Sequence, residues 1–159
     1  MLRLHYYKYS LELLHSFTIA GNSRTFTPVV FVELHYKDWI GYGEASLPPY
    51  LKENQESVFQ FLAQLNIEKF EDPLLVDEIL NYIESIAPEN TAAKAAVDIA
   101  LHDLIGKILN KPLHEILNID ISKMPETSMT IAIDKIEKII EKVKEAKNFK
   151  ILKVKLGCE

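Results

Sequence analysis

Apolar and polar positions alternate along the first third of the chain, with the period of a β-strand. The alternation covers residues 2–14. Residues 29–36 are rich in β-branched and aromatic side chains, and residues 39–43 return after a short turn. This pattern predicts an antiparallel meander of three strands, with a polar loop at residues 16–27.

After Asn54 the apolar period lengthens to about 3.6 residues, which is typical of helices. Asn54 is a suitable cap for one helix, and Asp72, followed by Pro73, for a second. Residues 92–109 predict a third helix, rich in alanine and therefore able to pack closely against a neighbour. Residues 113–117 predict one further helical turn.

A strand–helix–strand unit follows. It consists of a strand at residues 126–131, a helix that Asp134 can cap, and a strand at residues 151–156. The isoleucines of this helix form an apolar stripe, and Lys142 is expected on its outer face. Such a unit is normally a right-handed crossover between parallel strands. We therefore expect the opening of a parallel α/β domain after the meander and the helices.

Composition narrows the class of protein. The chain has 159 residues, a formal net charge of -5 and 48% hydrophobic residues, enough for one domain or a small domain plus part of another. The mild acidity does not fit a nucleic-acid-binding protein, and no apolar run approaches the roughly 20 residues of a membrane span. The N-terminus lacks the apolar stretch of a secretory signal. The only cysteine, Cys158, excludes a disulfide within the chain. We expect a cytoplasmic protein.

The most suggestive chemistry lies in Lys153 and Lys155, which alternate along the last strand and so point to the same face. On spacing alone, the commoner explanation is an edge strand whose lysines discourage aggregation. Thr130 ends the preceding strand, and Arg24 lies in the polar loop. In a parallel barrel, the carboxyl ends of the strands line the active site. A lysine beside another cation gives up its proton more readily, so this arrangement could move a proton near neutral pH.

Other chemistries lack a pattern in the sequence. The five histidines form no His-x-x-x-His pair, and no cluster of three carboxylates stands at plausible strand ends. The glycines do not form a phosphate-binding loop, and no Gly-x-Ser-x-Gly elbow is present. We interpret the His102–Asp103 pair on the alanine-rich helix as packing or capping.

Four stretches, in order along nearly the whole chain, resemble motifs of the enolase superfamily. They are Gly41–Ala45, Ala95–Leu104 with Lys111–Leu113, Thr127–Thr130 and Leu152–Gly157. The first is similar to the family's Gly-x-Gly-Glu-Ala, the second to its alanine-rich helix, the third to its first barrel strand and the last to its Lys-x-Lys strand. The chain thus resembles the muconate-lactonizing branch of the superfamily, and within it the dipeptide epimerases.

The resemblance implies an α+β capping domain, a three-stranded antiparallel meander plus helices, at residues 1–122. The start of a (β/α) barrel would follow at residues 123–159. It also implies an isomerase that binds a small-molecule substrate, a dipeptide, and removes and returns the proton α to its carboxylate. An enediolate forms in this chemistry and is stabilised by Mg²⁺.

Residue roles follow from the resemblance by position. Lys155 would be the acid/base on one face of the α-carbon, and Lys153 would hold the substrate carboxylate and stabilise the enolate charge. Thr130 would touch the substrate, and Arg24, in the family's first capping loop, would meet the far carboxylate or terminus of a dipeptide. The loop at Leu47–Tyr50 would close over the site and exclude water.

The family's Mg²⁺ ligands, and its lysine on the opposite face, are expected beyond residue 159. The chain ends directly after a strand, so we expect the front part of a longer enzyme and no activity from these 159 residues alone. Homo-oligomers are left open. The lysine pair is shared with o-succinylbenzoate synthase, muconate cycloisomerase and N-acylamino-acid racemase, which stay as alternatives. A hypothesis of another class is a non-catalytic α+β module that binds a partner through the meander.

Overall fold

A computed structural model of the chain describes residues 1–19 and 22–157, which form two compact units. The first unit holds Met1–Leu11 and Thr27–Ile119, and the second holds Glu12–Phe26, here named the hairpin tip, together with the residues from Asp120 onward. The sequence placed the hairpin tip in the first domain. The domain bounds 1–122 and 123–159 stay a prediction.

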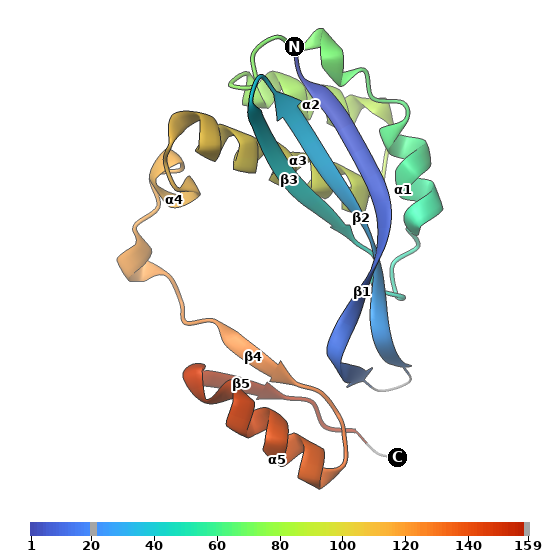
Figure 1. Cartoon of the computed structure of the whole chain (residues 1–159), viewed down its shortest axis with the longest axis vertical. Coiled ribbons are helices and arrows are strands. Elements are labelled where there is room, and N and C mark those ends of the chain that lie inside the picture. Colours follow the sequence, from blue (N-terminus) through green and yellow to red (C-terminus); the bar gives the residue numbers. More distant parts are fainter. Residues whose placement is uncertain (20–21, 158–159) are drawn as a thin grey trace. The chain divides into compact units, whose positions relative to one another are not determined.

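A three-stranded sheet begins the chain, in the order β1 (Arg3–Ile19), β2 (Asn22–Tyr36) and β3 (Trp39–Ser46) (Figure 1). Strands β2 and β3 are antiparallel, with Val32 opposite Gly43. The predicted meander is therefore confirmed.

The polar loop predicted at residues 16–27 is wrong for the described residues, because β1 and β2 both extend into it. Its polar side chains pair between the strands, as the hydroxyls of Thr18 and Ser23 do at 2.9 Å. Threonine is also a good strand former, which a count of polar residues overlooks. Arg24 consequently lies in β2 instead of a loop. Residues 20–21, part of the same predicted loop, lie outside the described residues.

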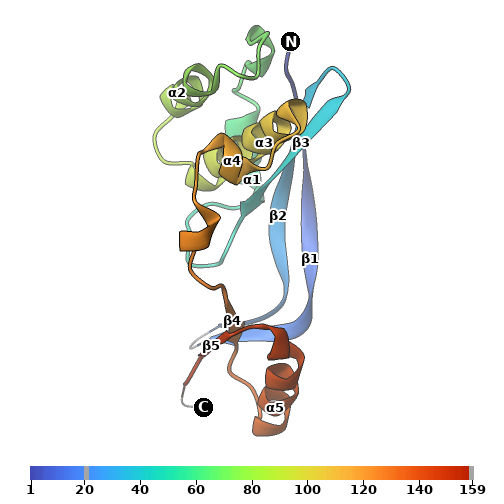
Figure 2. The same cartoon turned by 90° about the vertical axis from the view of Figure 1, so that its left-hand side faces the viewer.

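The helices of the first unit gather on one face of the sheet (Figure 2). They are α1 (Gln55–Leu62), the 3₁₀ turn η1 (Ile67–Lys69), α2 (Val76–Ile86), α3 (Thr91–Leu109) and α4 (Leu113–Ile116). Asn54 caps α1 as predicted, because its side chain accepts hydrogen bonds from the backbone of Glu56 and Ser57. The cap predicted at Asp72 is wrong. Its carboxylate accepts a hydrogen bond from the N–H of Leu74 at 2.9 Å and so stabilises the turn before α2.

Helix α3 lies against β3 so closely that two positions of the strand must be glycine. A Cβ added to Gly41 would lie 2.1 Å from the carbonyl oxygen of Ala100, and one added to Gly43 would lie 1.9 Å from that of Ala96. Ala96 and Ala100 of α3 are the other half of this contact, and both are completely buried. The Gly-x-Gly motif and the alanine-rich helix are thus one packing feature of the core.

The side chains of Glu53, Asn54 and Gln55, here named the three-residue anchor, connect the elements of the first unit. Glu53 accepts a hydrogen bond from the N–H of Ala92 at 3.0 Å and so caps α3, where Asn90 provides no side-chain cap. Asn54 caps α1. The Gln55 amide donates to backbone carbonyls of β1 and β2 at 2.9 and 2.8 Å.

The second unit contains the predicted strand–helix–strand. Strands β4 (Ser128–Ile131) and β5 (Ile151–Val154) are parallel and are connected through α5 (Ile136–Glu145) (Figure 1). Short 3₁₀ turns precede β4 at Ile121–Lys123 and follow α5 at Ala146–Asn148. The start of a parallel sheet is therefore confirmed. Among the described residues, no helix has the length and apolar character of a membrane span.

The buried side of α5 differs from the predicted one. Lys142, expected outside, is 8% exposed, whereas Ile136 and Ile140 of the apolar stripe are 64% and 47% exposed. The cation can be buried because Asp134 accepts its hydrogen bond at 2.8 Å. The cap predicted at Asp134 is wrong, because Lys135 is the N-cap of α5 and no side chain among the described residues caps the helix. The other oxygen of Asp134 accepts the N–H of Lys135 at 2.8 Å.

Candidate functional site

Three of the four predicted site residues gather at the carboxyl ends of β4 and β5. Thr130 stands directly opposite Lys153 in the parallel register. Lys155 follows β5, and its N–H continues the ladder by donating to the carbonyl of Ile131 at 2.9 Å. Opposite residues of paired strands point to the same face, and alternate residues share a face. Thr130, Lys153 and Lys155 therefore lie on one face, and Ile131, only 1% exposed, lies on the other.

The charged side chains on this face are the two lysines, and both are accessible to solvent. Lys153 is exposed and Lys155 is half-buried. Within residues 1–19 and 22–157, neither ammonium forms an ion pair with a carboxylate. Two cations beside a hydroxyl suit an anionic substrate, whose carboxylate would relieve the repulsion between them.

Arg24 lies apart from the lysines, in a pocket of about 410 Å³ within the second unit. Its guanidinium carbon is 5.4 Å from the centre of the Phe17 ring. The Nε and one Nη atom are buried and have no hydrogen-bond partner among the described residues. Buried donors of this kind usually meet a partner, so the pocket is prepared for an acceptor.

The pocket joins the hairpin tip to β4 and to the end of α5. Its walls are Leu13, Leu14, His15, Ser16, Phe17, Arg24, Met129, Thr130, Ile131, Ala132, Lys142, Glu145, Ala146 and Phe149. Thr130 therefore belongs both to the pocket and to the lysine face: it lines the pocket with Arg24 and lies beside Lys153 in the sheet. The two lysines do not line this pocket.

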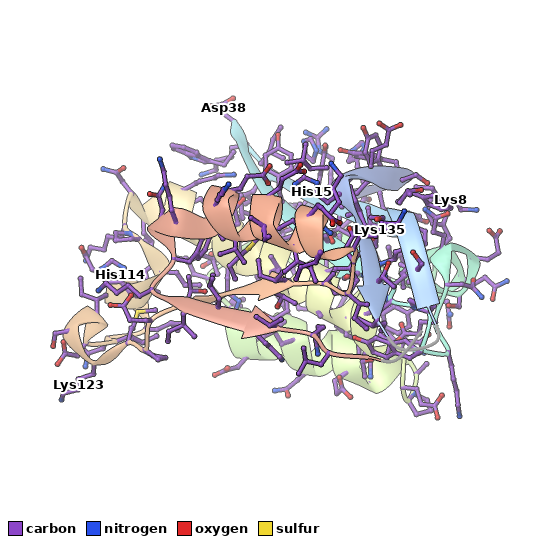
Figure 3. The ribbon with its side chains drawn as sticks, turned by 90° about the horizontal axis from the view of Figure 1, so that it is seen from below. Lys8, His15, Asp38, His114, Lys123 and Lys135 are labelled. Carbon is purple, nitrogen blue, oxygen red and sulfur yellow. The ribbon has the colours of Figure 1, made fainter. Side chains whose placement is uncertain are left out.

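Sequence patterns missed two polar contacts of the second unit. The ammonium of Lys142, followed by the N–H of Lys135, holds the pKa of the Asp134 carboxyl below its ordinary value through hydrogen bonds. His15 lies on β1 beside α5 (Figure 3), and its Nε2 is 2.7 Å from Glu145 Oε2. Neither pair has a local signal, because their members are 8 and 130 positions apart.

The lowered pKa of Asp134 predicts a loss of stability in acid. The folded state holds this carboxylate ionised more strongly than the unfolded chain, so its contribution is complete above about pH 4 and disappears as the pH falls through the folded pKa. Asp134→Asn is expected to lower the urea midpoint, and the difference from the wild type should be larger at pH 7 than at pH 3. Asp38→Asn, in the exposed β2–β3 turn, is the control. An equal difference at both pH values would contradict the prediction.

The residues of the site do not suit Mg²⁺. Ammonium, guanidinium and a single hydroxyl cannot provide the carboxylate oxygens that Mg²⁺ prefers. No group of three or more His, Cys, Asp or Glu is placed to hold a metal within the part of the chain that the structure describes. Ligands beyond residue 159 stay a prediction.

Comparison with known proteins identifies the family of the chain. Residues 8–118 match the N-terminal domain of the mandelate racemase/muconate lactonizing enzyme family. The L-Ala-D/L-Glu epimerase of Bacteroides thetaiotaomicron is 50% identical over 157 residues, which are 98% of this chain and 41% of that protein.

Solved structures agree. The dipeptide epimerase of Methylococcus capsulatus, complexed with Mg and the dipeptide L-Arg-D-Lys, has a TM-score of 0.83 and 29% identity over 97% of this chain and 45% of its own. The dipeptide epimerase of Cytophaga hutchinsonii, complexed with Mg and the dipeptide D-Ala-L-Val, has a TM-score of 0.79 and 29% identity. The match covers 98% of this chain and 44% of the epimerase chain.

The chain spans less than half the length of these relatives. The match to the family's N-terminal domain agrees with the capping domain that the motifs implied. The parallel pair β4–β5 and the solved structures agree with the implied barrel opening. The chain belongs to the mandelate racemase/muconate lactonizing enzyme family of the enolase superfamily.

Proposed function

We propose that the chain is the N-terminal part of a dipeptide epimerase, an isomerase that inverts the carbon next to a carboxylate. The observation that carries this proposal is the placement of Thr130, Lys153 and Lys155 on one face of β4 and β5. The 50% identity to an L-Ala-D/L-Glu epimerase supports the same substrate class.

In the proposed reaction, Lys155 removes the α proton, and the electron pair of the C–H bond moves into the carboxylate to form an enediolate. Lys153 binds the carboxylate and stabilises the charge that develops on its oxygens, because an ammonium is fixed where the charge appears. Thr130, opposite Lys153, orients the substrate through its hydroxyl. The proton returned to the opposite face comes from a second base, which we place beyond residue 159.

Mg²⁺ belongs to the proposal for the full-length protein, with ligands beyond residue 159, and supplies positive charge when bound. Two of the solved relatives are complexed with Mg. The cytoplasmic location and a homo-oligomeric state are likewise proposals.

Arg24 is proposed to bind a second carboxylate, at the far end of the dipeptide. Its unpartnered, buried nitrogens support this role. A charge-assisted hydrogen bond is worth about 1.5–3 kcal/mol, so Arg24→Met is expected to raise KM for a dipeptide with an acidic distal group by roughly 10- to 100-fold. KM for an uncharged dipeptide should change by less than about threefold. Arg3→Met, an exposed arginine of β1, is the matched control. Equal KM increases for both substrates would exclude the role.

The test of the function is a dipeptide library incubated with the full-length protein and Mg²⁺ in D₂O. Deuterium should enter the α position of the residue that carries the free carboxylate, together with inversion, and most rapidly in dipeptides with an acidic side chain. No incorporation into any dipeptide would refute the proposal. Exchange only with N-acylamino acids, or turnover of o-succinylbenzoate precursors or muconates, would favour the other members of the superfamily. Without any turnover, the non-catalytic binding module would be favoured.

A further inference from the structure

The hairpin tip is attached to the rest of the second unit by few polar contacts. The carbonyl of Thr18 accepts a hydrogen bond from the N–H of Ile133 at 3.1 Å. His15 contacts Glu145, the last residue of α5, at 2.7 Å between Nε2 and Oε2. The first contact joins backbone atoms only. The attachment therefore depends on a side chain at His15, and a substitution there can test it.

Glu145 stands where a carboxylate is unfavourable by itself. The carboxyl end of a helix carries a partial negative charge, which repels an anion and attracts a cation. Glu141, one turn earlier, is paired with Lys138 at 2.7 Å, and its charge also interacts with His15. Lys142 and Arg24 line the same pocket and oppose them, but Lys142 is already paired with Asp134. A hydrogen-bond donor such as an imidazole N–H therefore suits the charge at the end of α5.

His15 is also connected to the guanidinium of Arg24. It is two residues from Phe17 on β1, and the Phe17 ring supports the guanidinium at 5.4 Å. Side chains two apart on a strand share a face, so both His15 and Phe17 point toward the pocket, which they line. Loss of the contact at His15 would free the strand that supports Arg24.

We infer that His15 is a positioning residue: with Glu145 it holds the hairpin tip against α5, and so fixes Arg24 for the distal carboxylate of the substrate. The part that concerns the substrate rests on the proposed function. The contact is a hydrogen bond between the imidazole and the carboxylate, with 2.7 Å between Nε2 and Oε2.

The expected effect is moderate, because the side chains of His15 and Glu145 are 38% and 56% exposed. Ion pairs with this exposure are worth a factor of about two to five in an equilibrium. The experiment must therefore compare rates in the hairpin tip itself instead of overall stability.

Hydrogen–deuterium exchange of the full-length protein tests the attachment without any substrate. At pH 6, His15→Gln and Glu145→Gln should raise exchange of the hairpin-tip amides by about two- to fivefold. Glu126→Gln, which breaks the exposed Lys150 pair of the same unit, is the control. Wild-type exchange in both variants would overturn the inference.

Kinetics test the consequence for Arg24. At pH 6, His15→Gln should raise KM for an acidic dipeptide by about two- to fivefold, with kcat and the KM of an uncharged dipeptide unchanged. If His15 had only a structural role, KM would rise for both substrates, and this result would refute positioning. An unchanged KM for the acidic dipeptide together with faster hydrogen–deuterium exchange would also refute it. If no dipeptide is turned over, the proposed function fails, while the exchange experiment still decides whether His15 holds the hairpin tip.

Discussion

Replacing Lys155 with alanine is expected to abolish exchange of the substrate α proton with solvent in one stereochemical series. Lys155 lies on the face shared with Thr130 and Lys153, and in the proposed reaction it acts on one side of the α-carbon. A positioned acid/base group contributes roughly 10²–10⁴ in rate, which sets the size of the loss. The measurement is deuterium incorporation from D₂O into each diastereomer of a dipeptide, followed by NMR, with the full-length protein.

The matched control is Lys147→Ala, which removes an exposed lysine after α5 and should leave exchange unchanged. Lys155→Arg separates charge from proton transfer, because an arginine stays protonated and cannot act as a base near neutral pH. Undiminished exchange in both stereochemical series would remove Lys155 from its proposed role.

Gly43→Ala is expected to have the largest effect on folding. The new methyl group would lie 1.9 Å from the carbonyl oxygen of Ala96 and 2.9 Å from the backbone nitrogen of Ala100. Both contacts are with backbone atoms of α3, so relief requires the helix to move away from the sheet. Overpacking of this kind lowers the free energy of unfolding by about 1–3 kcal/mol and sometimes more. Because the new methyl group would meet backbone atoms, we expect a loss at or above the upper end of this range. Urea unfolding of the full-length protein measures the change.

Gly106→Ala is the control, because Gly106 lies in the same helix and its added Cβ would be 3.2 Å from a single carbonyl oxygen, that of Lys111. Alanine stabilises a helix interior by about 0.5–1 kcal/mol relative to glycine, which would offset this tight contact and leave the midpoint nearly unchanged. A wild-type urea midpoint for Gly43→Ala would disprove the packing argument.

The fold was predictable where local pattern and tertiary structure agree. The Asn54 cap, α3 and the strand–helix–strand unit each depend on residues close together in the chain. Residues 16–27 were misjudged because composition does not reveal that a polar segment pairs with another strand. Lys142 was misplaced for a related reason: its partner Asp134 lies eight positions away, outside the spacing at which helix neighbours are recognised.

Part of the candidate site was predictable from local sequence patterns, and part was not. Lys153 and Lys155 were found because the period of a strand places them on one face, and their pairing with Thr130 needed only the parallel register. The surroundings of Arg24 could not be found from sequence, since they join the hairpin tip to α5 over more than a hundred positions. The family, by contrast, was predictable, because its motifs occur in order along the chain.

The three-residue anchor has a consequence for how relatives of this protein can diversify. The segment of residues 48–52 begins after Leu47, which is 4% exposed, and ends at the anchor, so both of its ends are fixed to the core. Tyr50 within it is 77% exposed. Loop closure costs little more when a surface loop lengthens. This segment can therefore be exchanged as a cassette during evolution or by design, changing what it covers while α1, α3 and the sheet keep their places.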